Sequence, residues 1–160
     1  MAIIYRILSL IINIFSFFIA VTLILLIPAS LVMPPFWLPV FLLVAVVLYT
    51  WFSNKFRRLV LRQKEVVRTS LKDWVKVNGY VTIVFSILSL PGAIALLRNP
   101  AVYMANMYEM MGKMGNHSSQ AFTERSAIIL ALIMIFYFLI LLVHVFWTFA
   151  LIRKHAQYFQ

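Results

Sequence analysis

The sequence predicts an all-α integral membrane protein whose helices form a four-helix bundle within the bilayer. The chain is 64% hydrophobic and only 11% charged, whereas about a quarter of the residues in soluble domains are charged. The apolar residues fall into four long runs, and about 20 residues of helix cross a hydrocarbon core of roughly 30 Å. The Lys and Arg residues lie between or beside these runs. We therefore expect one transmembrane domain over residues 1–160.

The apolar runs and the residues that flank them predict where the spans begin and end. Pro28 ends the first run, which is longer than a signal-peptide core and lacks a good cleavage signal after it, so we expect a retained span. A proline-rich turn leads to the second run, which carries Trp37 near one end and Trp51 near the other, as interfacial aromatic residues do. The predicted spans cover approximately residues 7–27, 36–52, 79–97 and 127–152.

The distribution of cations predicts the orientation of the bundle. With four spans, eleven of the 14 Lys and Arg residues lie on one side: Arg6, those within residues 53–76, and Arg153 with Lys154. The opposite side has three, at positions 98, 113 and 125. Cytoplasmic loops carry the excess of positive charge, so we expect both termini in the cytosol. Because the cations follow the membrane topology, the net charge of +10 does not indicate nucleic acid binding.

The segment between the second and third spans, residues 53–76, predicts a basic helical hairpin at the cytosolic surface. Apolar residues recur in it at helical spacing, which leaves one apolar face among many cations. Two interpretations remain open: helical extensions of the two spans, or a separate interfacial helix that binds anionic lipid. The candidate headgroup contacts are Lys55, Arg57, Arg58, Arg62, Lys64 and Arg68.

The predicted spans contain no Asp, Glu, Lys or Arg, and all four carboxylates lie in loops. Ion-coupled transport usually requires an ionisable group within the membrane, and paired-carboxylate catalysis requires two acids together. The chain also has no cysteine, which excludes thiolate metal sites and cysteine nucleophiles within it. We therefore expect a protein that is not an enzyme.

Polar residues within the spans form a second group of candidates. At 1.5 Å per residue they lie at similar depths, which predicts one hydrogen-bonded layer in the cytosolic leaflet. The simplest interpretation is that this layer joins the helices. In an alternative interpretation, the histidine of this layer, His144, is a haem ligand or a proton carrier. A bis-histidine haem would need a partner chain. The members of the layer are Asn13, Tyr49, Thr82, Ser86 and His144.

The outer loop, residues 98–126, is rich in methionine. If residues 103–117 are helical, five thioethers fall within an arc of about 120°, with an imidazole at its edge. Thioether and imidazole ligands suit Cu(I), but methionine is also an adaptable hydrophobe at partner-binding surfaces. The loop is therefore either an amphipathic lid or partner surface, or a copper site. The candidate copper ligands are Met104, Met107, Met111, Met114 and His117.

These observations favour a non-enzymatic membrane protein, an accessory or scaffold subunit that works through helix packing and lipid contact. Its expected partners are the bilayer, anionic lipids, and another membrane protein or a second copy of the chain. We expect no cofactor in this case; the alternative is a small transporter or copper-handling protein that uses the methionine-rich loop. In layout alone, the chain resembles small four-span proteins of bacterial inner membranes, which implies that location.

Overall fold

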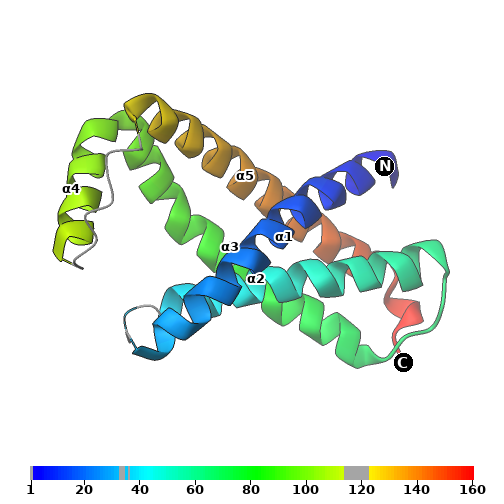
Figure 1. Ribbon diagram of the computed structural model, residues 1–160. Coiled ribbons are helices and arrows are strands. Elements are labelled where there is room, and N and C mark those ends of the chain that lie inside the picture. The colour runs from blue at the N-terminus through cyan, green and yellow to red at the C-terminus, as the bar shows by residue number, and fades with distance from the viewer. Residues whose placement is uncertain (1, 33–34, 36, 114–122) are drawn as a thin grey trace. The chain divides into compact units, whose positions relative to one another are not determined.

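The computed structural model describes residues 2–32, 35, 37–113 and 123–160 of the chain. Most of these residues are helical, and no extended strand forms among them (Figure 1). In chain order the elements are α1 (Ala2–Val32), α2 (Trp37–Phe56), the π-helix η2 (Arg57–Arg62), α3 (Thr69–Arg98), α4 (Pro100–Lys113), α5 (Glu124–Lys154) and the 3₁₀ turn η3 (Ala156–Tyr158).

Four helical segments in the described part of the chain are long and apolar enough to cross a membrane. Each extends beyond the apolar run that predicted it, because polar and charged residues continue the helix at its ends. The prediction of an all-α chain with four helices of membrane-spanning length is therefore confirmed. The four segments are Ile3–Pro28, Trp37–Arg62, Thr69–Arg98 and Glu124–Lys154.

Two prolines near the connection between the first two spans lie inside helices. The first candidate span ends at Pro28, and α1 continues past it to Val32. A proline removes one backbone hydrogen bond, whereas ending the helix among apolar residues would expose several polar backbone groups, which is more costly in lipid. Pro39 lies in the first turn of α2, where the N–H group that it lacks would have no helical partner.

Helical extensions account for most of residues 53–76. The second span continues through α2 into η2 and ends at Arg62, and α3 begins at Thr69. Only residues 63–68 between them are irregular, apart from one bridge residue. Residues 53–76 are all described and contain no separate interfacial helix. Of the two interpretations of this segment, the structure therefore agrees with extended spans.

The chain divides into two compact units, and the first comprises Met1–Phe85 and Ile140–Gln160. Within it α1 packs against α2, and both helices reach α5 through hydrogen-bonded tyrosine side chains. α3 approaches α5 at Gly79, where a Cβ atom would lie 2.7 Å from ring atoms of Phe149. A glycine at this position permits close contact between the helices, as small residues do in membrane bundles.

The segment after α5 is tied to the connection between η2 and α3. The Val67 N–H donates to the carbonyl of Tyr158 at 2.8 Å, and the Gln160 N–H donates to the carbonyl of Val67 at 3.0 Å. The Phe159 ring stacks on Phe56, with 6.0 Å between ring centroids. These contacts hold the irregular connection, residues 63–68, against the C-terminal residues that follow α5.

The second unit, Ser86–Leu139, contains the rest of α3, all of α4 and the first part of α5. Leu96, Met104, Ala127 and Ala131 are its buried apolar cluster. Met104, which is 7% exposed, fills the space beside two alanines, as a flexible thioether side chain commonly does. The cluster thus joins α4 to both long helices of this unit.

Candidate functional site

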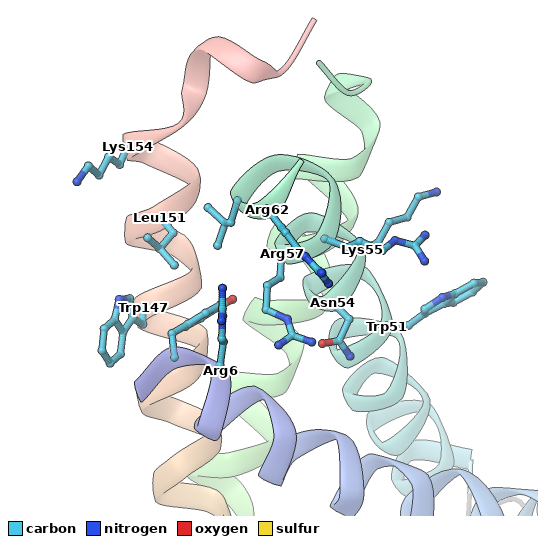
Figure 2. Close-up of a pocket in the computed structure, with 12 residues that line it drawn as sticks. Arg6, Trp51, Asn54, Lys55, Arg57, Arg62, Trp147, Leu151 and Lys154 are labelled. Carbon is cyan, nitrogen blue, oxygen red and sulfur yellow. The ribbon is translucent and has the colours of Figure 1, made fainter. Parts of the chain in front are cut away.

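A cavity of about 830 Å³ opens in the first unit, near the start of α1 and the junction of α2 with η2 (Figure 2). We call it the basic pocket. Its cationic lining residues are Arg6, Lys55, Arg57, Arg58, Arg62 and Lys154. Its uncharged lining residues are Tyr5, Trp51, Asn54, Leu61, Trp147 and Leu151.

Charge is the main property of the basic pocket, because six lining side chains are cationic and none is acidic. In Figure 2, Lys154 extends outward from α5, away from the other labelled cations. Arg57 is half-buried and the other five cations are exposed; like charges that line one cavity repel one another. An anion would relieve that repulsion, and guanidinium groups bind phosphate or carboxylate through paired hydrogen bonds.

The π-helix explains how two arginines five residues apart line the same pocket. In an α-helix such residues are separated by about 140° around the axis, since 3.6 residues make a turn. η2 has wider turns, and the Gln63 N–H donates to the carbonyl of Arg58, five residues earlier, at 3.1 Å. Arg57 and Arg62, its first and last residues, both line the pocket. The fully buried Val60 anchors the turn to the unit.

Asn54 in the pocket lining is held by a reciprocal amide pair with Asn13 of α1. The Asn13 Nδ2 donates to Asn54 Oδ1 at 3.3 Å, and the Asn54 Nδ2 donates to Asn13 Oδ1. Because an unpaired amide is costly within a membrane, this pair specifies how α1 and α2 meet. It also leaves the second N–H of each amide available to a ligand or water.

Tyr5 in the pocket lining belongs to a buried cluster as well. Its ring stacks on the imidazole of His144, with centroids 4.8 Å apart and 7° between the planes. Its hydroxyl lies 3.0 Å from Oγ1 of Thr148. The basic pocket is therefore in direct contact with hydrogen-bonded groups between α1 and α5.

His144 is the centre of that cluster. Its Nδ1 lies 2.8 Å from the Tyr49 hydroxyl and its Nε2 lies 3.0 Å from the Ser9 hydroxyl. The Thr148 hydroxyl lies 3.1 Å from that of Tyr49 and donates to the carbonyl of His144 at 2.8 Å. These four residues and Tyr5, which we call the polar cluster, are all buried. They join α1, α2 and α5.

The contacts of the polar cluster suit either tautomer of a neutral imidazole. With the proton on Nε2, His144 donates to Ser9, Ser9 donates to the carbonyl of Tyr5, and Tyr49 donates to Nδ1. With the proton on Nδ1, His144 donates to Tyr49, Tyr49 donates to Thr148, and Ser9 donates to Nε2. The distances of both chains fit hydrogen bonds. Each arrangement satisfies both ring nitrogens and gives up one further contact, Tyr49 to Thr148 in the first and Ser9 to the carbonyl of Tyr5 in the second.

Two residues of the predicted polar layer, Tyr49 and His144, are brought together in this cluster. Asn13 pairs with Asn54 instead. Sequence reasoning missed Ser9 and Thr148 as direct partners of the histidine, although helical spacing is a signal for the second. Thr148 lies four residues after His144, on the same side of α5.

The other two members of the predicted layer are Thr82 and Ser86 of α3. Thr82 is buried in the first unit, and its hydroxyl donates to the carbonyl of Asn78 in its own helix at 2.7 Å. Ser86 is buried and belongs to the second unit. Beyond the contact between Tyr49 and His144, the layer of five residues stays a prediction.

The alternative in which His144 binds haem meets a specific obstacle. Both ring nitrogens lie at hydrogen-bonding distance from hydroxyl groups of Tyr49 and Ser9, and Tyr5 covers one face of the ring. Iron coordination needs a nitrogen lone pair directed at open space. A haem would have to displace one of these contacts.

Four of the six predicted headgroup contacts line the basic pocket, namely Lys55, Arg57, Arg58 and Arg62. Lys64 and Arg68 are exposed on the irregular connection and do not line it. The structure adds Arg6 and Lys154, which sequence reasoning used only for orientation. Both flank apolar runs, and only the tertiary structure shows that these flanks converge with η2.

The candidate copper ligands are only partly described. Met104 is buried in the apolar cluster of the second unit. Met107 and Met111 lie in α4, and the surroundings of their side chains fall outside the described residues. Met114 and His117 also lie outside them.

No family model, no curated protein and no solved structure matches this chain. The chemistry of the basic pocket and the polar cluster is thus the guide to function.

Proposed function

We propose that this chain is a non-enzymatic multi-pass membrane protein, an accessory or scaffold subunit, whose basic pocket holds the headgroups of anionic lipids. The observation that carries the proposal is a cavity with six cationic side chains and no acidic one. Such a cavity favours an anionic occupant, which offsets the repulsion among its cations. Lipid headgroups are the anions that a membrane protein meets at this level of its helices.

The surroundings of the pocket support a headgroup as the occupant. Trp51 and Trp147 both line it, and tryptophan side chains concentrate at the level of the headgroups. Leu151 adds an apolar wall beside the cations. In this proposal the basic end of the first unit lies in the cytosolic leaflet, with both termini in the cytosol, and the membrane is the bacterial inner membrane. The excess of cations at that end is the basis for the orientation.

The exposed faces of the helices support an accessory role. α1 carries a large exposed apolar surface that includes Phe17, Phe18 and Leu25. In a bilayer such a surface contacts lipid or another membrane helix. Purification in a mild detergent should therefore recover a stoichiometric membrane partner or a second copy of the chain. Recovery of a clean monomer would argue against the accessory role.

A lipid titration tests the headgroup site itself. The purified full-length protein is titrated with phosphatidylglycerol or phosphatidylcholine, and bound lipid is measured by native mass spectrometry. The double variant Arg57→Gln/Arg62→Gln removes two pocket cations, and Lys64→Gln/Arg68→Gln removes two exposed cations outside it. We expect the pocket variant to weaken phosphatidylglycerol binding about tenfold or more, since one charge-assisted hydrogen bond contributes that much.

The second double variant is the matched control, because it removes the same net charge from the same segment. We expect it to weaken binding less than about twofold, because Lys64 and Arg68 do not line the pocket and an isolated surface charge contributes little. Equal losses in the two variants would mean that diffuse surface charge attracts the lipid. In that case the pocket would not be a binding site.

A further inference from the structure

The basic pocket contains more cationic groups than a single phosphodiester neutralises. Phosphodiester headgroups carry one negative charge, whereas a terminal phosphate carries about 1.5 to 2 negative charges at neutral pH and has three acceptor oxygens. The pocket lining has six cationic side chains and no acidic one. This excess of positive charge favours a headgroup with a terminal phosphate.

The positions of the arginines agree with that preference. Arg57 and Arg62 line the pocket from η2 and Arg6 lines it from α1 (Figure 2). Guanidinium groups bind phosphate oxygens through a planar fork of donors. Several guanidiniums in one cavity can bind the three terminal oxygens of a phosphate monoester, whereas a phosphodiester leaves only two oxygens free of ester bonds.

The cavity is also larger than inorganic phosphate requires. Its volume of about 830 Å³ falls in the range of sites for organic ligands, roughly 300 to 1,000 Å³. Half-buried Leu61 and Leu151 and the indole of Trp147 line it together with the cations. This apolar part suits the glycerol and the first carbons of a lipid chain, so the occupant is a lipid rather than a soluble phosphate.

We propose that the basic pocket selects lipids whose headgroup ends in a phosphate monoester or diphosphate over lipids with a phosphodiester headgroup. The proposal rests on the lipid-binding function proposed above and names its ligand class. Arg6, Arg57 and Arg62 contact the terminal phosphate. Asn54, held by Asn13, offers its remaining amide N–H to the same group.

The test compares phosphatidic acid, which has a monoester headgroup, with phosphatidylglycerol of the same acyl chains. The full-length protein in mild detergent is titrated with each lipid, and the affinities are measured at pH 8 and pH 5. At pH 8 we expect phosphatidic acid to bind about tenfold more tightly or better, which is the gain from one further charge-assisted contact. At pH 5 the monoester has lost most of its second charge, since its second pKa is about 6, and the ratio should approach one.

The ratio of the two affinities isolates the contribution of the ligand. Both lipids meet the same protein at each pH, so any titration of the protein acts on both. Equal affinities at pH 8 would overturn the proposal. A third arm adds inorganic phosphate at the same concentration as phosphatidic acid, and displacement of the lipid by it would also overturn the proposal, because the site would then be one for soluble phosphate.

Arg57→Gln and, separately, Arg6→Gln should each abolish most of the preference for phosphatidic acid at pH 8. Two variants are used so that poor folding of one leaves the other informative, and each is checked by size-exclusion chromatography. The control Lys64→Gln/Arg68→Gln should retain the ratio of the wild type. A preference that survives both pocket variants would place its source elsewhere and overturn the assignment.

The outcomes separate this proposal from the function on which it rests. If the wild-type protein binds neither anionic lipid more tightly than phosphatidylcholine, the lipid-binding function itself fails. If it binds phosphatidic acid and phosphatidylglycerol equally, and the pocket variants weaken both, the function stands and only the preference for a terminal phosphate is refuted.

Discussion

The hydroxyl group of Tyr49 on α2 lies 2.8 Å from Nδ1 of His144 on α5. The two residues are 95 positions apart in the sequence, so the contact joins helices that are distant along the chain. Within the bilayer, no water is present as an alternative hydrogen-bond partner for these groups. It also orients the imidazole on which Tyr5 stacks. Since Tyr5 lines the basic pocket, the Tyr49–His144 contact supports one wall of that pocket.

Tyr49→Phe should therefore destabilise the protein. The substitution keeps the ring but removes the hydroxyl, which leaves Nδ1 and Thr148 with fewer partners. Interhelical hydrogen bonds in membranes contribute about 0.6 kcal/mol on average and up to about 2 kcal/mol, so we expect a loss in that range, measured as a lower midpoint of thermal unfolding in detergent. Tyr80→Phe, at a side chain that is 58% exposed, is the control and should change little. Equal midpoints for Tyr49→Phe and wild type would contradict the structural role of the cluster.

The Asn13–Asn54 pair predicts a measurable coupling between α1 and α2. We expect Asn13→Ala and Asn54→Ala each to lower the free energy of unfolding, and the double variant to lose less than the sum of the two. Once one amide is absent the other has no partner to lose, so the coupling should be about 0.5 to 2 kcal/mol. Strictly additive losses in the double-mutant cycle would show that the two side chains do not interact.

Substitution of glycine by alanine should have opposite effects on stability at Gly79 and at Gly92, which both lie in α3. Gly79→Ala places a Cβ atom 2.7 Å from the Phe149 ring, and overpacking of this kind costs about 1 to 3 kcal/mol. Gly92→Ala meets nothing within 4 Å and gains up to about 1 kcal/mol of helix propensity. Thermal unfolding should therefore occur at a lower temperature for the first variant and at the same or a higher temperature for the second. If Gly79→Ala proved as stable as Gly92→Ala, the close approach of α3 and α5 would be wrong.

The proposed orientation can be tested without removing any native thiol, because the chain has no cysteine. Thr123→Cys and Gln157→Cys replace exposed residues on opposite sides of the last span. A membrane-impermeant maleimide should label Thr123→Cys on intact cells and Gln157→Cys only after the membrane is permeabilised. The reverse pattern would mean that the basic end faces outward, contrary to the proposed topology.

Hydropathy and helix length were sufficient to predict the all-α class and the four long helices. These properties depend on local composition, since each run of apolar residues has to satisfy its own backbone in lipid. The same reasoning placed the end of the first apolar run at Pro28, and α1 continues past this proline to Val32. In an apolar segment the loss of one hydrogen bond at a proline does not outweigh the loss of several at a broken helix.

Part of the candidate site could be predicted from the sequence. The residues that could not be predicted are brought into the site by the tertiary structure. The basic residues between the second and third spans were identified from their charge. That Arg57 and Arg62 line the same pocket depends on the π-helix, and α-helical periodicity would have separated them. The convergence of Arg6 with them depends on how α1 packs, for which the sequence contains no local signal. Asn54 was missed for the same reason, since its partner Asn13 lies on another helix.

The most direct test of the account is a density map of the full-length protein in nanodiscs prepared from its own membrane lipids. We expect tetrahedral density for a phosphate group in the basic pocket, within about 3 Å of guanidinium nitrogens of Arg6, Arg57 and Arg62, continuous with a lipid chain beside Trp147. A pocket that contains only water, or that is closed by the protein's own side chains, would contradict it.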